Sequence, residues 1–192
     1  MKKFLFIFLF ITSISLISQN LKKELFVKYT TNEIRIDGIL NENDWDLATG
    51  VNDFYEYRPE FDDKPKSPAT IKILNDDQFL YVGIKIEVNK NDQKTGSLKR
   101  DFDATVSDFI ALVFDTFNDA TNAFAIGSNH EAIQRDLLIF NGGSPQGRSY
   151  DMSWDIKWFS ESKIYEDFYT TCLLYTSPSP RDISGSRMPS SA

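Results

Sequence analysis

The stretch FLYVGIKIEV, residues Phe79 to Val88, is the part of the sequence that decides the fold. It is rich in β-branched and aromatic residues, it has the length of a strand, and turn residues precede it. Other segments have the same character: PATIKILN (Pro68 to Asn75), DFIALVFDTF (Asp108 to Phe117), NAFAIGS (Asn122 to Ser128) and AIQRDLLIFN (Ala132 to Asn141). The sequence therefore predicts a series of β-strands over residues 68–141.

The segments between these strands favour tight turns. Asn75-Asp76-Asp77, Asn118-Asp119 and Asn141-Gly142-Gly143 tolerate positive φ or bond to their own backbone, as hairpin turns require. Beyond a short turn over Glu42 to Ala48, no run has convincing helical periodicity. Many short strands without alternating helices indicate an all-β fold, an antiparallel β-sandwich of the jelly-roll or immunoglobulin-like kind.

Composition limits the number of domains and the class of ligand. The 192 residues are 41% hydrophobic and 14% aromatic, which suits one domain with one core. The net charge is −7, and no basic cluster is interleaved with aromatic residues. An acidic chain repels phosphate backbones, so we exclude nucleic acid as a partner.

The N-terminus has the order of a secretory signal peptide. MKKFLFIFLFITSISLISQN begins with two lysines, continues with an apolar run from Phe4 to Ile17, and ends with polar residues. We expect a signal peptide over residues 1–18 and a mature domain over 19–171; an uncleaved N-terminal anchor is the alternative. The sequence therefore predicts an exported protein.

Several motifs carry a family resemblance over about residues 33–168. They are IDGILNENDWDLA (Ile36 to Ala48), LYVGIKI (Leu80 to Ile86), RDFDATVSDFIALVFDTFNDATNAFAI (Arg100 to Ile126), IQRDLLI, and WDIKW (Trp154 to Trp158). Together they resemble the carbohydrate-binding module family 9-like domain found at the N-terminus of Gram-negative surface proteins. The resemblance implies a β-sandwich. It also implies a periplasmic, outer-membrane or cell-surface location, and a downstream partner region resembling an outer-membrane β-barrel.

The end of the chain departs from that family. Its members continue with further strands of the sandwich, whereas this chain continues with CLLYTSPSPRDISGSRMPSSA. Cys172 to Asp182 match, letter for letter, one reading frame of a sequencing adapter. We therefore expect a C-terminally truncated sandwich with an artefactual tail over 172–192 that does not pack. We also expect less complete cover for hydrophobic residues such as Phe109, Val113 and Phe124.

Most enzyme classes lack their residues in this sequence. His130 is the single histidine, and Gly-x-Ser-x-Gly, P-loop and dinucleotide motifs are absent. A glycoside hydrolase needs only two carboxylates a few ångströms apart, and carboxylates are abundant here. Asp115, Asn118 and Asp119 supply hard oxygen ligands of the kind that calcium prefers, and the family resemblance implies a structural calcium ion.

Sugar binding requires exposed aromatic rings beside polar groups. Tyr55 and Tyr57 share a face in an extended segment, and Trp154 and Trp158 share one if residues 153–160 form one strand. Trp45 fits better as a core residue. The family resemblance implies a clamp of two tryptophans, but Asp103 to Val106 hold no aromatic at the first position. The second would lie beyond residue 171.

Three functions remain open. The first is a non-catalytic carbohydrate-binding domain of an exported protein involved in polysaccharide binding or breakdown, which requires an exposed aromatic surface. The second is a periplasmic or surface accessory domain of an outer-membrane β-barrel protein, without sugar binding. The third is a fragment of a glycoside hydrolase, which requires two close carboxylates in a cleft.

Overall fold

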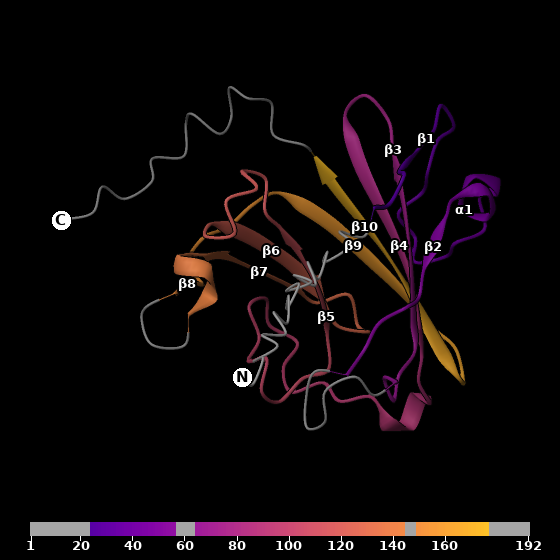
Figure 1. Ribbon diagram of the computed structural model, residues 1–192. Coiled ribbons are helices and arrows are strands. Elements are labelled where there is room, and N and C mark those ends of the chain that lie inside the picture. The colour runs from indigo at the N-terminus through magenta and orange to yellow at the C-terminus, as the bar shows by residue number, and fades with distance from the viewer. Residues whose placement is uncertain (1–23, 57–63, 145–148, 177–192) are drawn as a thin grey trace, which may run out of the picture.

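The computed structural model describes residues 24–56, 64–144 and 149–176, so the predicted signal peptide lies outside the described residues. The described chain forms two sheets packed face to face, which confirms the predicted β-sandwich (Figure 1). Among the described residues, helices are confined to α1 (Asn43–Leu47) and two short 3-10 turns, η1 (Lys90–Asp92) and η2 (Asn141–Gly143). Within the described ranges, no helix is long and apolar enough to cross a membrane.

The larger sheet has the strand order β1-β3-β4-β10-β9, and β2 also pairs with β3. β1 and β3 are parallel, whereas the other pairs are antiparallel. The strands are β1 (Lys28–Tyr29), β2 (Gly50–Val51), β3 (Ala69–Asn75), β4 (Phe79–Glu87), β9 (Trp158–Ile164) and β10 (Phe168–Thr176).

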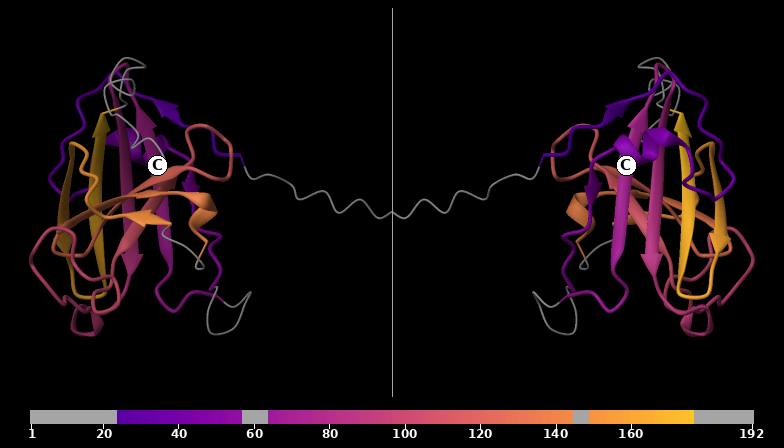
Figure 2. Two further views of the ribbon diagram at one scale, coloured as in Figure 1. Left: turned by 90° about the vertical axis from the view of Figure 1, so that its left-hand side faces the viewer. Right: turned by 90° about the vertical axis from the view of Figure 1, so that its right-hand side faces the viewer.

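The smaller sheet is an antiparallel meander with the order β5-β6-β7-β8. Figure 2 shows it in front of the larger sheet in the left view. Its strands are β5 (Ile110–Phe114), β6 (Ala123–Ser128), β7 (Gln134–Ile139) and β8 (Tyr150–Asp151). β5, β6 and β7, like β3 and β4, lie within the predicted segments, because β-branched and aromatic residues bounded by turn residues fit a pleated surface. No segment was predicted at the short strand β8.

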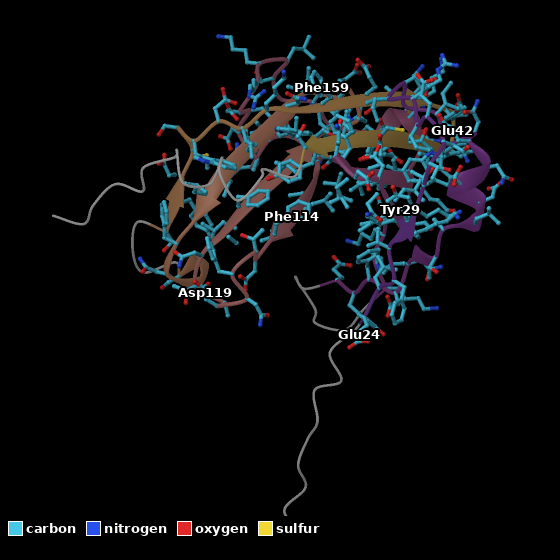
Figure 3. All side chains as sticks on the ribbon, turned by 90° about the horizontal axis from the view of Figure 1, so that it is seen from above. Glu24, Tyr29, Glu42, Phe114, Asp119 and Phe159 are labelled. Carbon is cyan, nitrogen blue, oxygen red and sulfur yellow. The ribbon has the colours of Figure 1, made fainter. Side chains whose placement is uncertain are left out.

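The main core lies between the two sheets. β4 contributes Val82, Ile84 and Ile86, and Tyr169, Leu173 and Tyr175 of β10 lie beside them. The smaller sheet contributes Ile126 and the half-buried Phe114 and Phe124, which stack with ring centroids 5.0 Å apart. Figure 3 shows Phe114 on the side of the smaller sheet that faces the larger one.

A second cluster covers the outer face of the larger sheet. Trp45 of α1 is 1% exposed and packs with Ile34, Leu74 and Tyr81, so it is a core residue as expected. Gly83 of β4 makes this approach possible, since a Cβ there would lie 2.9 Å from Trp45 Cζ3. The right view of Figure 2 shows α1 in front of this face. The larger sheet is therefore buried on both faces around Gly83.

The prediction that the tail from Cys172 stays outside the sandwich is wrong for residues 172–176. They are the second half of β10, which pairs with both β4 and β9. Cys172 is 0% exposed on the outer face, and Leu173 is 1% exposed on the inner face. The letters CLLY fit because apolar residues suit a strand that is buried on both faces. Residues 177–192 lie outside the described part of the chain, and the adapter origin of the tail stays a prediction.

Two hydrophobic residues that were expected to be poorly covered are exposed for a different reason. Phe109 is 37% exposed and Val113 is 60% exposed. Both lie on the outer face of the smaller sheet, because inward and outward positions alternate along the strand and Ile110, Leu112 and Phe114 point inward. Their exposure therefore follows from sheet geometry, not from missing strands.

Candidate functional site

The structure describes three of the four aromatic residues predicted to bind sugar. Tyr55 follows β2 and is 60% exposed, whereas Tyr57 lies outside the described residues. Trp154 and Trp158 do not share a strand, because β9 begins at Trp158. Trp158 is 3% exposed within the main core. It has no free ring face for a ligand, so the prediction of a Trp154–Trp158 surface is wrong.

Trp154 lies at the margin of the core. It is half-buried, and its ring centroid is 5.6 Å from that of Phe124. Phe124 also contacts Tyr175, at 5.4 Å between centroids. Trp154 thus ends a row of packed rings between the sheets, and this packing accounts for its aromatic side chain.

The predicted calcium ligands form the turn between β5 and β6, which Figure 3 shows at Asp119. Asp115 accepts hydrogen bonds from the backbone N–H groups of Asp119 and Ala120, at 3.2 and 2.9 Å. Asp119 accepts 2.7 Å bonds from the N–H groups of residues 121 and 122, and these bonds lower the pKa of its carboxyl. The carboxylates therefore serve the turn itself. Calcium binding at Asp115, Asn118 and Asp119 stays a prediction.

The buried carboxylate of Asp136 is also hydrogen-bonded within the protein. Asp136 of β7 is 1% exposed; it accepts 2.8 Å bonds from Arg100 Nη2 and from the N–H of Ile156. Burial raises the pKa of Asp136, while the Arg100 charge opposes that rise. Over the described residues, no three His, Cys, Asp or Glu side chains gather as metal ligands would. The contact between Asp136 and Arg100 therefore fits a structural role. It fits less well the role of two catalytic carboxylates on either side of a glycosidic bond.

The outer face of the smaller sheet carries an exposed apolar surface, which we call the platform. Small residues lie at its centre, where Ala125 of β6 stands between Val113 and Leu137. Ile139 pairs with Tyr150, whose ring is 48% exposed. The Tyr150 hydroxyl donates to Gly143 O at 3.0 Å, which fixes the ring. The platform consists of Phe109, Val113, Leu137, Ile139 and Tyr150.

A polar group borders one end of the platform. Arg135 of β7 is 7% exposed; it donates to Phe102 O and, at 2.8 Å, to Met152 Sδ. The Phe102 ring lies over its guanidinium, 5.9 Å from the centroid, and meets Phe109 edge-on at 5.6 Å. Two hydrogen bonds from Thr105, and then the Arg135 charge, lower the pKa of Asp103. An apolar surface thus ends at a fixed carboxylate and a buried guanidinium.

The segment Asp103 to Val106, where the resemblance implies a tryptophan, lies at this polar end. Phe102 precedes it but is 2% exposed, and Val106 is 53% exposed. Sequence reasoning missed Phe102, Phe109, Arg135 and Tyr150 as a group. The alternation of Phe109, Ala111 and Val113 was the one available signal, since it places these residues on one face of a strand.

Comparison with solved structures identifies the class of fold. The chain is similar to a family 9 carbohydrate-binding module from Caldicellulosiruptor kristjanssonii in complex with cellotriose. The TM-score is 0.55 at 14% identity, over 80% of this chain and 67% of that one. The same module in complex with glucose gives a TM-score of 0.55 at 14% identity, over 82% of this chain and 70% of that one. No protein-family model and no curated protein matches the chain. The chain therefore has a family 9-like carbohydrate-binding module fold.

Proposed function

We propose that this chain is a non-catalytic carbohydrate-binding domain and that the platform is its ligand surface. The observation that carries the proposal is the platform itself, an exposed apolar face with Phe109 and Tyr150 on the smaller sheet of a family 9-like sandwich. The two similar modules hold cellotriose and glucose, which supports a saccharide as the ligand class. The apolar face of a pyranose stacks on such rings, while its hydroxyls need polar neighbours.

The proposed contacts predict weak binding. Tyr150 and Phe109 offer ring surface, and the Asp103 carboxylate can accept a hydrogen bond from a sugar hydroxyl. The two-tryptophan clamp that the resemblance implies has no aromatic residue at its first position, so one stacking contact of ~1 kcal/mol is lost. This loss weakens the binding of a saccharide about fivefold.

The wider role is part of the same proposal. The N-terminal lysines and apolar run support export, and the family resemblance supports a place in a glycan-handling protein at the Gram-negative surface. The alternative is an accessory domain that uses the platform for contact with its own downstream region. Exposed apolar patches serve protein contacts as well as ligands, so the binding experiment decides between the two.

Calorimetric titration with cellotriose and xylotriose tests the proposal. Phe109→Ala and Tyr150→Ala should each weaken binding about fivefold, the equivalent of ~1 kcal/mol per ring. The matched control is Phe159→Ala, since Phe159 is an exposed ring (48%) on β9 of the other sheet. Equal losses for all three variants would reject the platform, and no binding to any neutral glycan would favour the accessory-domain alternative.

A further inference from the structure

A second concave site lies on the outer face of the larger sheet, beside α1. This outer groove has a volume of about 420 Å³ and is lined by residues that include Asp46, Lys72, Gly83, Lys85, Tyr165 and Phe168. The segment that carries Leu40 and Trp45 packs against Gly83. The neighbouring part of the sheet is left uncovered, and the outer groove lies there. A groove of this size falls in the range of small-molecule sites.

Two lysines flank the floor of the outer groove. Lys72 pairs directly with Gly83, and Lys85 lies two residues further along β4, so the lysines are diagonal neighbours on one face. Lys72 Nζ donates to Trp45 O at 2.7 Å, and among the described residues it has no carboxylate within ion-pair distance. Lys85 Nζ lies 3.4 Å from Glu87 Oε1, a pair that solvent screens because both side chains are largely exposed. Neighbouring like charges repel, and an anion between them would relieve that repulsion.

A stacked pair of aromatic rings adjoins the two lysines. Tyr165 and Phe168, at the turn between β9 and β10, stack with centroids 4.3 Å apart and an interplanar angle of 16°. Lys85 Nζ lies 4.7 Å from the Phe168 centroid. The stacked pair is thus held beside an ammonium group. The arrangement offers a ring surface and a positive charge within one groove.

We propose that the outer groove binds an acidic oligosaccharide, with a uronate carboxylate between Lys72 and Lys85 and a pyranose against the face of Tyr165 that is turned away from Phe168. The choice of a saccharide rests on the proposed function, whereas the choice of an anionic one rests on the two lysines. Asp46, at the rim, is exposed and can accept a hydrogen bond from a sugar hydroxyl. The site is separate from the platform, which lies on the other sheet.

The test is titration of the full chain with trigalacturonate, beside cellotriose as the neutral probe and hexaglutamate as an acidic peptide. Lys72→Gln with Lys85→Gln should weaken trigalacturonate binding at least about tenfold, because each charge-assisted hydrogen bond is strong. Raising the salt from about 0.05 M to about 0.5 M should weaken it in the wild type. Lys72→Arg with Lys85→Arg should restore most of the affinity, and Lys90→Gln, an exposed lysine of η1, should have no effect.

The outcomes separate this proposal from the proposed function. If Phe109→Ala loses cellotriose binding but keeps trigalacturonate binding, the result supports two separate sites. If trigalacturonate binding depends on the two lysines and cellotriose does not bind at all, the result supports the outer groove and not the platform. The proposal is overturned if trigalacturonate does not bind, or if its affinity is the same for the wild type and for the Lys72→Gln, Lys85→Gln double variant. It is also overturned if hexaglutamate binds as tightly as trigalacturonate. Circular dichroism of each variant shows whether the sandwich remains intact.

Discussion

The two sheets of the sandwich differ in how they are buried. In β4, the consecutive residues Tyr81, Val82, Gly83 and Ile84 are all buried, because the core covers one face and the segment around α1 covers the other. In β5, inward and outward positions alternate between half-buried and exposed. Cover on both faces supplies stability, and on the outer face of the larger sheet the outer groove remains open beside α1. Within the described part of the chain, the outer face of the smaller sheet has no such layer: contacts of Arg135 with Phe102 and Met152 close one end, and the exposed side chains of the platform lie beside it.

The largest expected effect is the protection of the Cys172 thiol by the larger sheet. The thiol is 0% exposed in β10, and burial raises its pKa to about 12. Thiolates are the reactive form, so labelling requires opening of the larger sheet. With an unfolding free energy of about 5 kcal/mol, alkylation should be at least ~10³-fold slower in native than in denatured protein. Rapid labelling of the native chain by iodoacetamide would mean that β10 does not hold the larger sheet closed.

Trp45→Ala should have the next largest effect. Trp45 is 1% exposed, and its Nε1–H donates to Glu42 Oε2 at 3.0 Å. Removing so large a buried side chain should lower the free energy of unfolding by about 3–5 kcal/mol. Urea titration followed by circular dichroism measures this change. A cost below about 1 kcal/mol would show that the outer cluster contributes little and that the larger sheet depends on one face, like the smaller one.

Arg100→Ala tests the polar contact at the edge of the smaller sheet. At neutral pH it should lower the free energy of unfolding by about 1.5–3 kcal/mol, because the buried Asp136 carboxylate loses its charged partner. Burial already raises the pKa of Asp136, and loss of Arg100 should raise it further. A raised pKa in the folded state means that stability is lost as pH rises from about 4 through that pKa.

The deficit of Arg100→Ala should therefore be smaller at about pH 4 than at pH 7, as measured by urea unfolding at both values. Arg100→Lys, which keeps the positive charge, is the matched control and should show a smaller deficit at pH 7. A deficit that is the same at both pH values would show that Arg100 acts by packing alone.

Val113→Ala should have the smallest effect. Val113 lies on the platform and is 60% exposed, so its truncation should change the free energy of unfolding by no more than about 0.5 kcal/mol. Urea titration measures this change beside that of Leu173→Ala in the larger sheet, which should lower the free energy of unfolding by about 2–5 kcal/mol. The two values compare the sheets directly. Similar costs for both variants would mean that the platform is covered in solution.

Local pattern was enough to predict most of the sandwich. The expected strands at 68–75, 79–88 and 122–128 contain β3, β4 and β6 almost residue for residue, and the short turn at Glu42 to Ala48 contains α1. β-branched residues and Asn, Asp or Gly turns define such elements within a few residues of chain. The condition that residues 153–160 form one strand is not met, since β9 begins at Trp158 and nothing local distinguishes the chain before Trp158 from the strand that follows it.

The binding surface was harder to predict because it depends on which face of each strand is covered. Trp158 and Tyr150 are both aromatic and close in sequence, yet one is 3% and the other 48% exposed. That difference arises from sheet order, which sets the neighbours across the sandwich. The second half of β10 was missed because the match to an adapter outweighed the strand character of Cys172 to Tyr175.

The position of β10 has a consequence for synthesis of the chain. β10 pairs with β4 from Phe168 opposite Glu87 to Thr176 opposite Phe79, so roughly eighty residues or more separate the partners. At ~5–20 residues per second, the β3–β4 hairpin waits about 4–16 s for that partner while one apolar edge stays unpaired. Contacts this distant in sequence also slow folding. A newly made chain therefore has an aggregation-prone interval that ends only when β10 takes its place between β4 and β9.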